Sequence, residues 1–375
     1  MKNIMYPDYN NSIANLACSV LKYYGIEPPN DSLKIADDIL KKEYKNVVLI
    51  LLDGMGMHIL EKHLEPGGFF RKHLIGTYSS VFPPTTVAAT TSVLSGLFPN
   101  QHCWLGWDCY FKELDKNVTV FSNTEQMTGE KAADYSVAGK YCPYTNILDR
   151  ISDAGIAAHF LAPFRNPFPS SFQEECAQIK DLCREAGRKY IYAYWDDPDT
   201  TMHRHGTGGD KIRDLILNLE KDVENLVNDL EDTLVLVTAD HGHLDTGGVV
   251  ITDYPDLCEC LVRMPSIEPR ALNLFVKDGM AEKFSRLFNE HFHDQFLLFS
   301  KREVIEKKLF GTGVNSMRLN DMLGDFLAVA TGGLTIFNTA EEQRKFKSAH
   351  AGITSEEMII PLIAADNGDG DAVFD

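Results

Sequence analysis

Acidic and imidazole side chains recur at four places in this 375-residue chain, each beside a turn. The residues concerned are Asp53, Asp199, His203, Asp240, His241 and His350. Carboxylates and imidazoles suit Zn²⁺ or a similar ion, and two such ions about 4 Å apart can hold a phosphoryl group during its transfer. The residue types and their order therefore predict a site for two divalent metal ions.

Two of these places follow apolar runs that are typical of buried strands. Asp53 comes directly after Val47–Leu52, although an Asp at such a position can instead cap the next helix. Asp240 and His241 follow the run 234–238. Neighbouring residues of a strand point to opposite faces, so both can bind one ion only if the strand ends there. The glycines after Asp53 and after His241 permit such turns.

The sequence supports a metal ligand more strongly at one of the other two places than at the second. Asp199 and His203 are four residues apart, on one face of a helical turn that Pro198 would begin. A solvated acidic loop is the alternative there, with three nearby competitors, namely Asp196, Asp197 and His205. A lone His such as His350 is more often a surface or capping residue. His243 is a candidate neighbour of the site, and the remaining histidines are expected to be structural.

A hydroxyl-rich segment at 82–96 supplies candidate nucleophiles. Thr85 and Thr86 precede a predicted helix that ends near Gly96. A hydroxyl at that helix N-terminus would meet unpaired N–H groups and the positive end of the helix dipole, which favour a bound phosphate. Simple N-capping by either threonine is the alternative. Trp104, Trp107 and Tyr110 follow this helix and belong either to the core or to a substrate pocket.

Composition narrows the class of protein. The formal net charge is −18, which disfavours a nucleic-acid-binding surface, so a phosphate-bearing substrate needs a local positive centre such as bound cations. No signal peptide and no membrane span is evident. The eight cysteines lack paired zinc-ribbon spacing and are expected to be reduced thiols. We expect a cytoplasmic protein that acts on a small phosphorylated substrate, without a nucleic-acid polymer or a membrane as partner.

The elements that must position these residues alternate between strand and helix. Strands are predicted at Val47–Leu52, 157–161, 190–195 and 234–238, and helices at 172–187 and 209–230. This alternation predicts an α/β fold with a mostly parallel sheet and helices on both faces, with ligands at the carboxyl ends of the strands. The predicted division is a helical extension at 1–45, a core at 46–254 and 347–366, and an accessory α+β region at 255–346.

Five segments together resemble the alkaline phosphatase superfamily, most closely type I phosphodiesterases and nucleotide pyrophosphatases. These segments are LILLDGMG around Asp53, FPPTTVAATTSVLSGLFPNQH at 82–102, WDDPDTTMHRHG at 195–206, TADHGH at 238–243 and AHAGITSEEMIIPLI at 349–363. They occur in the family's order between about residues 46 and 363. The resemblance does not cover the N-terminal helices or most of 255–346.

The resemblance implies a role for each candidate. Asp53, Asp240 and His241 match the ligands of one zinc ion, and Asp199, His203 and His350 match those of the other. Thr86 matches the nucleophile, which also contacts the metals and becomes transiently phosphorylated or nucleotidylated. The implied function is that of a metal-dependent phosphodiesterase or nucleotide pyrophosphatase with a covalent threonine intermediate.

The chain departs from the family pattern at one position, which leaves the substrate open. Nucleotide pyrophosphatases usually carry an Asn three positions after the nucleophile, where this chain has Ala89. Either Thr90 or Thr91 compensates for the missing donor, or the substrate differs; Trp104 is a further candidate for substrate contact. No Arg that would mark a monoesterase stands beside the Thr86 helix. A monoesterase, a phosphonate hydrolase and a non-catalytic metal-binding protein are the alternatives, and the oligomeric state stays open.

Overall fold

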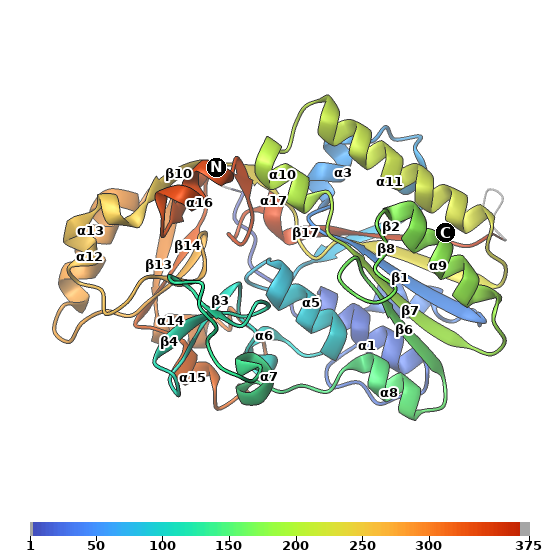
Figure 1. Ribbon diagram of the computed structural model, residues 1–375, viewed down its shortest axis with the longest axis horizontal. Coiled ribbons are helices and arrows are strands. Elements are labelled where there is room, and N and C mark those ends of the chain that lie inside the picture. Colours follow the sequence, from blue (N-terminus) through green and yellow to red (C-terminus); the bar gives the residue numbers. More distant parts are fainter. Residues whose placement is uncertain (1–2, 368–375) are drawn as a thin grey trace.

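The apolar run before Asp53 forms the centre of a six-stranded sheet in the computed structural model, which describes residues 3–367 (Figure 1). In spatial order the strands are β2 (Leu74–Ser79), β17 (Ile359–Ala365), β8 (Thr233–Thr238), β1 (Asn46–Leu52), β7 (Lys189–Trp195) and β6 (Ala157–Leu161). β1 is buried along its whole length and lies between β7 and β8. Helices cover both faces of such a strand, which explains its uninterrupted apolar sequence.

The strands on one side of this sheet are parallel and those on the other are antiparallel. β8, β1, β7 and β6 run in parallel. β17 is antiparallel to both of its neighbours, β8 and β2. The α/β fold with a mostly parallel sheet is thus confirmed, with an antiparallel edge added by a strand from the C-terminal part of the chain.

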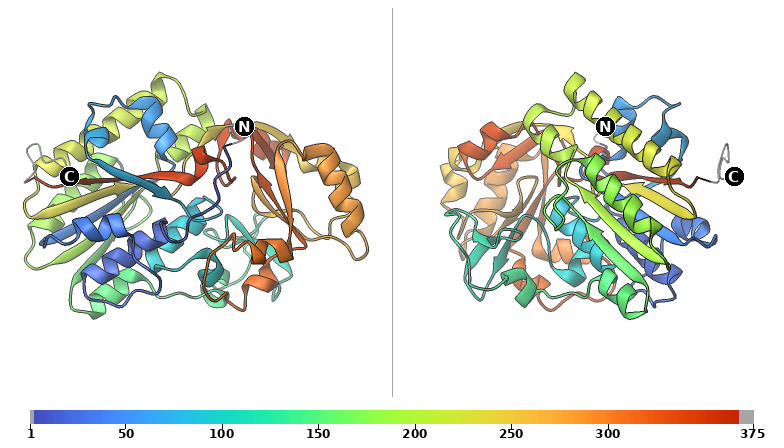
Figure 2. Two further views of the ribbon diagram at one scale, coloured as in Figure 1. Left: turned by 180° about the vertical axis from the view of Figure 1, so that it is seen from behind. Right: turned by 45° about the vertical axis from the view of Figure 1, so that its right-hand side comes forward.

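Two groups of helices lie on opposite faces of the sheet, as both views of Figure 2 show. One group consists of α1 (Ile13–Tyr23), α2 (Lys34–Ile39), α5 (Thr86–Ser95) and α8 (Ile147–Asp153). The other consists of α3 (Met57–His63), α4 (Phe69–Lys72), α9 (Phe172–Arg184) and α11 (Asp210–Asn228). None of the helices described is long and apolar enough to cross a membrane.

A second, seven-stranded sheet stands beside the first along the long axis of the molecule (Figure 1). Its strands, in spatial order, are β13 (Phe296–Ser300), β14 (Phe326–Ala330), β12 (Ala271–Leu274), β11 (Ser266–Glu268), β3 (Asp108–Phe111), β4 (Lys116–Thr119) and β5 (Thr124–Glu125). Four of these strands come from the predicted accessory range 255–346 and three from 108–125, so segments far apart in the sequence build one sheet. The domain limits themselves stay a prediction.

Shorter elements connect and flank the two sheets. The remaining strands are β9 (Leu244–Asp245), β10 (Gly247–Val250), β15 (Leu334–Phe337) and β16 (Ser348–Ala349). The remaining helices are α6 (Pro99–His102), α7 (Val137–Tyr141), α10 (Asp199–His205), α12 (Pro255–Cys258), α13 (Ala281–Phe292), α14 (Lys301–Glu306), α15 (Leu319–Met322), α16 (Ala340–Lys345) and α17 (Ser355–Met358), with a 3-10 turn at Ile251–Asp253. All eight cysteines are free thiols.

Most predicted elements occur with small shifts at their ends. The helix predicted at 172–187 ends at Arg184, and the helix predicted at 209–230 spans Asp210–Asn228. In the second sheet, β12 ends at Leu274. The backbone N–H of Val276 donates 2.7 Å to the Asp325 carboxylate instead of continuing the ladder.

Candidate metal centre and nucleophile

The strand registers bring the predicted ligands to one edge of the first sheet. Leu52, the last residue of β1, pairs with Trp195 at the end of β7, and Leu51 pairs with Thr238 at the end of β8. The residues that follow these strands therefore start at the same level. Two backbone hydrogen bonds continue the alignment, from the N–H of Asp53 to the Trp195 carbonyl (2.9 Å) and from the N–H of Asp199 to the Asp53 carbonyl (3.0 Å).

Glycines allow the loops at this edge to approach each other closely. Gly54 has a φ of +73°, and a Cβ atom there would lie 2.9 Å from the Cβ of Asp199. A Cβ atom on Gly242 would lie 1.9 Å from the carbonyl oxygen of Glu356. The turns after β1 and β8 thus require glycine, and the required glycines flank the candidate ligands.

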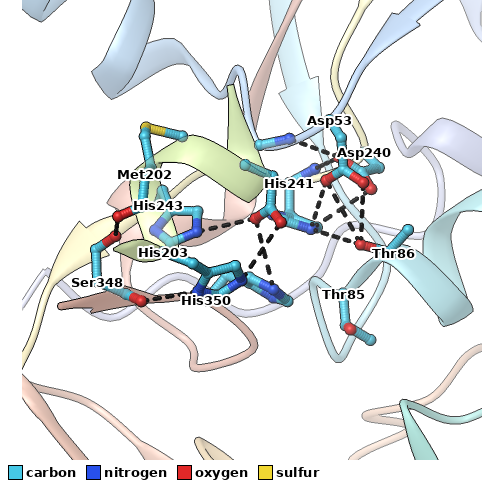
Figure 3. Close-up of polar contacts among 12 residues, drawn as sticks. Asp53, Thr85, Thr86, Met202, His203, Asp240, His241, His243, Ser348 and His350 are labelled. Carbon is cyan, nitrogen blue, oxygen red and sulfur yellow. Dashed lines mark hydrogen bonds and ion pairs between the residues drawn. The ribbon is translucent and has the colours of Figure 1, made fainter. Parts of the chain in front are cut away.

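The first group of side chains surrounds the Thr86 hydroxyl (Figure 3). Thr86 Oγ1 lies 3.2 Å from Asp53 Oδ2 and 3.3 Å from His241 Nε2. His241 Nε2 lies in turn 3.3 Å from Asp53 Oδ1 and 3.4 Å from Asp240 Oδ2. These four residues come from three separate segments, and their polar atoms converge on one small volume.

Asp240 has one satisfied and one unsatisfied carboxylate oxygen. Its Oδ1 accepts hydrogen bonds from the N–H groups of Gly54 (3.1 Å) and His241 (2.9 Å). Its Oδ2 is buried and has no hydrogen-bond donor among residues 3–367. Because a buried charge is normally paired or bound to a metal, this oxygen fits a cation ligand.

The second group gathers three imidazoles around Asp199. His203 Nε2 lies 3.3 Å from Asp199 Oδ2, and His350 Nε2 lies 3.8 Å from Asp199 Oδ1. His243 Nε2 is nearer, at 2.9 Å from Oδ1. Ligand atoms of all four residues lie within 4.8 Å of one another, and the same holds for Asp53, Asp199 and His241. Asp199 belongs to both sets, so the two groups are adjacent.

Backbone carbonyls orient three of the histidines in the same way. The Nδ1 atoms of His203, His241 and His350 lie 2.9, 3.0 and 3.1 Å from the carbonyls of Ser348, Gly242 and Pro84, respectively. A carbonyl only accepts, so each Nδ1 carries a proton and each Nε2 is the nitrogen that faces the site. This arrangement is the usual one for metal-bound imidazoles.

His243 is arranged differently from these three histidines. Its contact with Asp199 is made through Nε2, and its buried Nδ1 has no hydrogen-bond partner in the part of the chain that the structure describes. The Nε2 proton therefore points to the Asp199 carboxylate, which orients that carboxylate for the other two imidazoles.

The electrostatics of the site call for positive charge. Burial, reinforced by the nearby Asp53 charge, raises the pKa of Asp240 well above its usual range. Burial alone would lower the pKa of His241, but Asp240 and Asp53 raise it to about 10. Within residues 3–367 the only basic groups in ion pairs with these carboxylates and Asp199 are histidines. Divalent cations would supply the missing charge.

Neither threonine at the start of α5 uses its hydroxyl as a helix cap. α5 begins at Thr86, and Thr85 is its N-cap residue without a side-chain capping bond. The Thr85 hydroxyl donates 2.6 Å to Glu268 Oε1, and the Thr86 hydroxyl faces Asp53. Asp53 does not cap a helix either, since α3 begins after Gly56. The capping alternatives therefore do not explain these side chains.

A cavity of about 400 Å³ opens beside Thr86. Trp107 lines it, and its side chain is 46% exposed. Thr90, Thr91 and Trp104 do not line it, although the sequence favours them as substrate contacts. The Thr90 hydroxyl donates back to the Thr86 carbonyl (2.6 Å), and the Trp104 indole donates to the Cys142 carbonyl (2.9 Å). The cavity thus lends no support to these three substrate contacts.

Two of the three competitors around Asp199, namely Asp197 and His205, have partners other than the candidate ligands. Asp197 Oδ1 accepts from the backbone N–H of Thr201 (3.0 Å), and His205 contacts Lys211 at the surface. The helical turn predicted after Pro198 is present as α10. Its four-residue spacing places Asp199 and His203 together.

Two polar neighbours of the site escaped the sequence analysis. The buried Tyr194 hydroxyl donates to Asp53 Oδ2. Tyr194 lies in β7, one residue before the end of the strand. This position near a strand end is the sequence signal that could have identified it. Glu268 lies in β11, in the second sheet, and lines the cavity with Thr86. No local pattern could have found Glu268, because the pairing of β11 with β3 brings it there.

Comparison with known proteins agrees with this geometry. A family model described as type I phosphodiesterase/nucleotide pyrophosphatase matches residues 47–353. No curated protein sequence matches significantly. Murine ectonucleotide pyrophosphatase/phosphodiesterase 5 is similar in structure, with a TM-score of 0.65 and 18% identity over 85% of this chain and 88% of that chain. Phosphonoacetate hydrolase from Sinorhizobium meliloti 1021 is also similar in structure. Its TM-score is 0.63, with 15% sequence identity over 84% of this chain and 89% of that chain.

An α/β sheet with two adjacent groups of carboxylates and imidazoles beside a buried hydroxyl defines a metallo-phosphoesterase. The family match covers most of the chain. The protein belongs to the type I phosphodiesterase/nucleotide pyrophosphatase family and is a hydrolase of that kind.

Proposed function

We propose that the protein hydrolyses a phosphodiester or a nucleotide pyrophosphate through a covalent intermediate on Thr86, with two zinc ions bound. The observation that carries this proposal is the position of the Thr86 hydroxyl. It lies at the N-terminus of a ten-residue helix, 3.2 Å from Asp53 and 3.3 Å from His241. The helix N-terminus attracts an anionic phosphoryl group to the same point.

The ligand assignment follows the two groups. Asp53, Asp240 and His241 would hold one ion. Asp199, His203 and His350 would hold the other, and His243 would orient Asp199. The ions would lower the pKa of the threonine hydroxyl and neutralise charge on the phosphoryl oxygens.

The chain's own residues define the reaction geometry. The Thr86 hydroxyl gives up its proton and its oxygen forms a bond to phosphorus as the bond from phosphorus to the leaving alcohol or phosphate breaks, and the leaving group takes up a proton. Water then attacks phosphorus, the bond to the Thr86 oxygen breaks, a phosphate monoester is released and the threonine hydroxyl regains its proton. The core packing of α5, including the fully buried Ala89, holds Thr86 in place during both steps.

A monoester or a phosphonate is the second candidate substrate, since the fold is also that of a phosphonoacetate hydrolase. Among the described residues that line the cavity there is no arginine. A monoester dianion carries one more charge than a diester, so the lining favours the diester. A purely binding role would not require a hydroxyl beside the metal ligands.

The proposal is tested by turnover of bis(p-nitrophenyl) phosphate beside p-nitrophenyl phosphate, with metal content, in wild type and Thr86→Ala. We expect two zinc ions per chain and diester cleavage that falls by about 10³-fold or more in Thr86→Ala, since a covalent route is lost. Ser95→Ala removes a hydroxyl from the same helix, where it donates to the Thr91 carbonyl (2.6 Å) and accepts from the Leu97 N–H (3.1 Å), and serves as the matched control.

Each other outcome changes the assignment. A preference for the monoester would make the protein a phosphatase. Full diester activity in Thr86→Ala would exclude the threonine intermediate. Bound zinc without turnover of either compound would contradict the proposed diester hydrolysis.

A further inference from the structure

The cavity beside Thr86 carries three carboxylates in addition to the proposed metal ligands, namely Asp108, Glu268 and Glu342. Asp108 accepts from Thr119 (2.6 Å) and Gln126 (3.1 Å), both neutral.

Glu268 and Glu342 are likewise held by neutral donors. Glu268 Oε1 accepts from the Thr85 hydroxyl (2.6 Å) and from the backbone N–H of Trp107 (2.8 Å). Glu342 accepts from the backbone N–H of Thr339 (3.1 Å). In the described part of the chain, none of the three cavity carboxylates is in an ion pair with a Lys, Arg or His.

These three carboxylates act on one another. Burial, with a smaller contribution from Glu342, raises the pKa of Asp108 to about 6. Burial, with a smaller contribution from Asp108, raises the pKa of Glu268 to about 7. A cation bound in the cavity would pair with these carboxylates and relieve their mutual repulsion, next to a site that must accept a phosphoryl group.

Lys345 is the one lysine or arginine among the described residues that line the cavity. Its ammonium group lies 2.7 Å from Glu341 Oε1, a carboxylate that does not line the cavity, and both side chains are largely exposed. Lys345 thus has its own counterion and leaves the three cavity carboxylates without one.

Aromatic rings form the rest of the wall. Trp107 is 46% exposed, which is unusual for so large an apolar side chain. Phe337 and Phe346 stack with centroids 5.7 Å apart and planes 9° apart. Phe346 also contacts the ring of His203 at 4.6 Å, so the aromatic wall begins at the metal centre.

We propose that this cavity binds an organic ammonium group on the alcohol part of the phosphoric ester. Carboxylates attract such a cation through charge, and aromatic faces attract it through their quadrupoles. A second anionic group, such as the second phosphate of a nucleotide pyrophosphate, would instead be repelled by the three carboxylates, so this inference selects the phosphodiester from the two proposed substrates. This inference rests on the proposed function and names the substrate class of that same site.

The test compares two esters of the same shape and leaving group, p-nitrophenyl phosphocholine and p-nitrophenyl 3,3-dimethylbutyl phosphate. They differ in one atom, a positively charged nitrogen or a neutral carbon. We expect kcat/KM of the zinc-loaded wild type to favour the choline ester by about tenfold or more, given the usual strength of cation–π and charge attraction. The ratio within one protein cancels losses in folding or metal content.

Variants locate the source of the preference. Asp108→Asn and Glu342→Gln should each lower the ratio by about threefold or more, since each removes one charge from the wall. Glu282→Gln is the matched control: it removes an equal charge from the exposed start of α13, outside the cavity, and should leave the ratio unchanged. A fall of the same size in Glu282→Gln would show a general effect of net charge and would overturn the local site.

The outcomes separate this inference from the proposed function. Cleavage of both esters at equal rates, or a preference for the neutral one, would overturn the ammonium site and leave phosphodiester hydrolysis intact. Cleavage of neither ester would count against the proposed function. Calorimetric titration with phosphocholine and with 3,3-dimethylbutyl phosphate then decides the inference, since equal affinities overturn it and tighter binding of phosphocholine supports it.

Discussion

Asp240 carries two functions on its two carboxylate oxygens. Oδ1 holds the backbone after β1 and β8 by accepting from Gly54 and His241, whereas Oδ2 is buried without a donor. Without metal its negative charge opposes folding, because burial raises the pKa. With metal the same oxygen becomes a ligand, so this residue couples metal binding to stability.

Asp240→Asn separates these functions because the amide keeps an acceptor oxygen for the two N–H groups. We expect the variant to lose one zinc ion and nearly all activity, while its metal-free form melts at a higher temperature than metal-free wild type. The gain should be present at pH 7 and absent below about pH 4, where Asp240 is protonated in both folded and unfolded chains. Thermal unfolding of chelator-treated proteins across this pH range checks it. A variant that keeps both ions and full turnover would remove Asp240 from the ligand set.

The turn after β1 shows how the end of a strand positions the candidate metal ligands. Gly54 combines a φ of +73° with a close approach to Asp199. A positive φ and a close contact are each common at glycines. Together they fix the backbone after β1 against Asp199, the first residue of α10. The two metal groups therefore share one rigid edge.

Gly54→Ala compared with Gly25→Ala tests this element. Gly25 has nearly the same φ, +74°, but a Cβ atom added there would meet no other atom within 4 Å. Both variants should lose about 1–2 kcal/mol of unfolding free energy, since both place a Cβ in a left-handed conformation. Only Gly54→Ala should also lose zinc affinity and turnover, because its methyl group displaces Asp199. Urea denaturation and zinc competition measure the two effects. Equal zinc affinities in the two variants would contradict the argument.

At the scale of the whole molecule, a buried ion pair joins the second sheet to the loop that carries His350. Arg270 follows β11, and its Nε and Nη2 atoms lie 2.7 and 2.9 Å from the two carboxylate oxygens of Glu357. Both side chains are fully buried. Glu357 also accepts from the N–H of Gly352 at 2.6 Å. The pair thus fixes the segment after His350 against the second sheet.

Arg270→Met leaves the Glu357 charge buried and uncompensated. We expect a loss of about 3–5 kcal/mol of unfolding free energy, and a smaller loss in the double variant Arg270→Met/Glu357→Gln. Arg286→Met breaks an exposed pair with Glu290 and should cost less than about 1 kcal/mol. Urea denaturation of these variants and of Glu357→Gln, with zinc present, gives these values. A double variant as unstable as the sum of both single variants would show that the pair is not coupled.

Much of the site was predictable because local rules place its residues. The carboxyl ends of parallel strands meet at one edge, which brings Asp53 and Asp240 together. A four-residue spacing on a helical turn joins Asp199 to His203. The family follows from the order of these segments, which the match over 47–353 confirms.

The sequence by itself determined the α/β class, the buried strands and the family, since hydrophobic period and short-range spacing act within single elements. Only the tertiary structure decided which nitrogen each histidine presents, that His243 contacts Asp199, and that Glu268 reaches Thr85 across 183 residues. The physical reason is that these contacts depend on sheet order and on carbonyls from distant segments. No local pattern encodes such partners. The pairing of β11 with β3 brings Glu268, a carboxylate of the second sheet, to the start of α5, which packs on the first sheet.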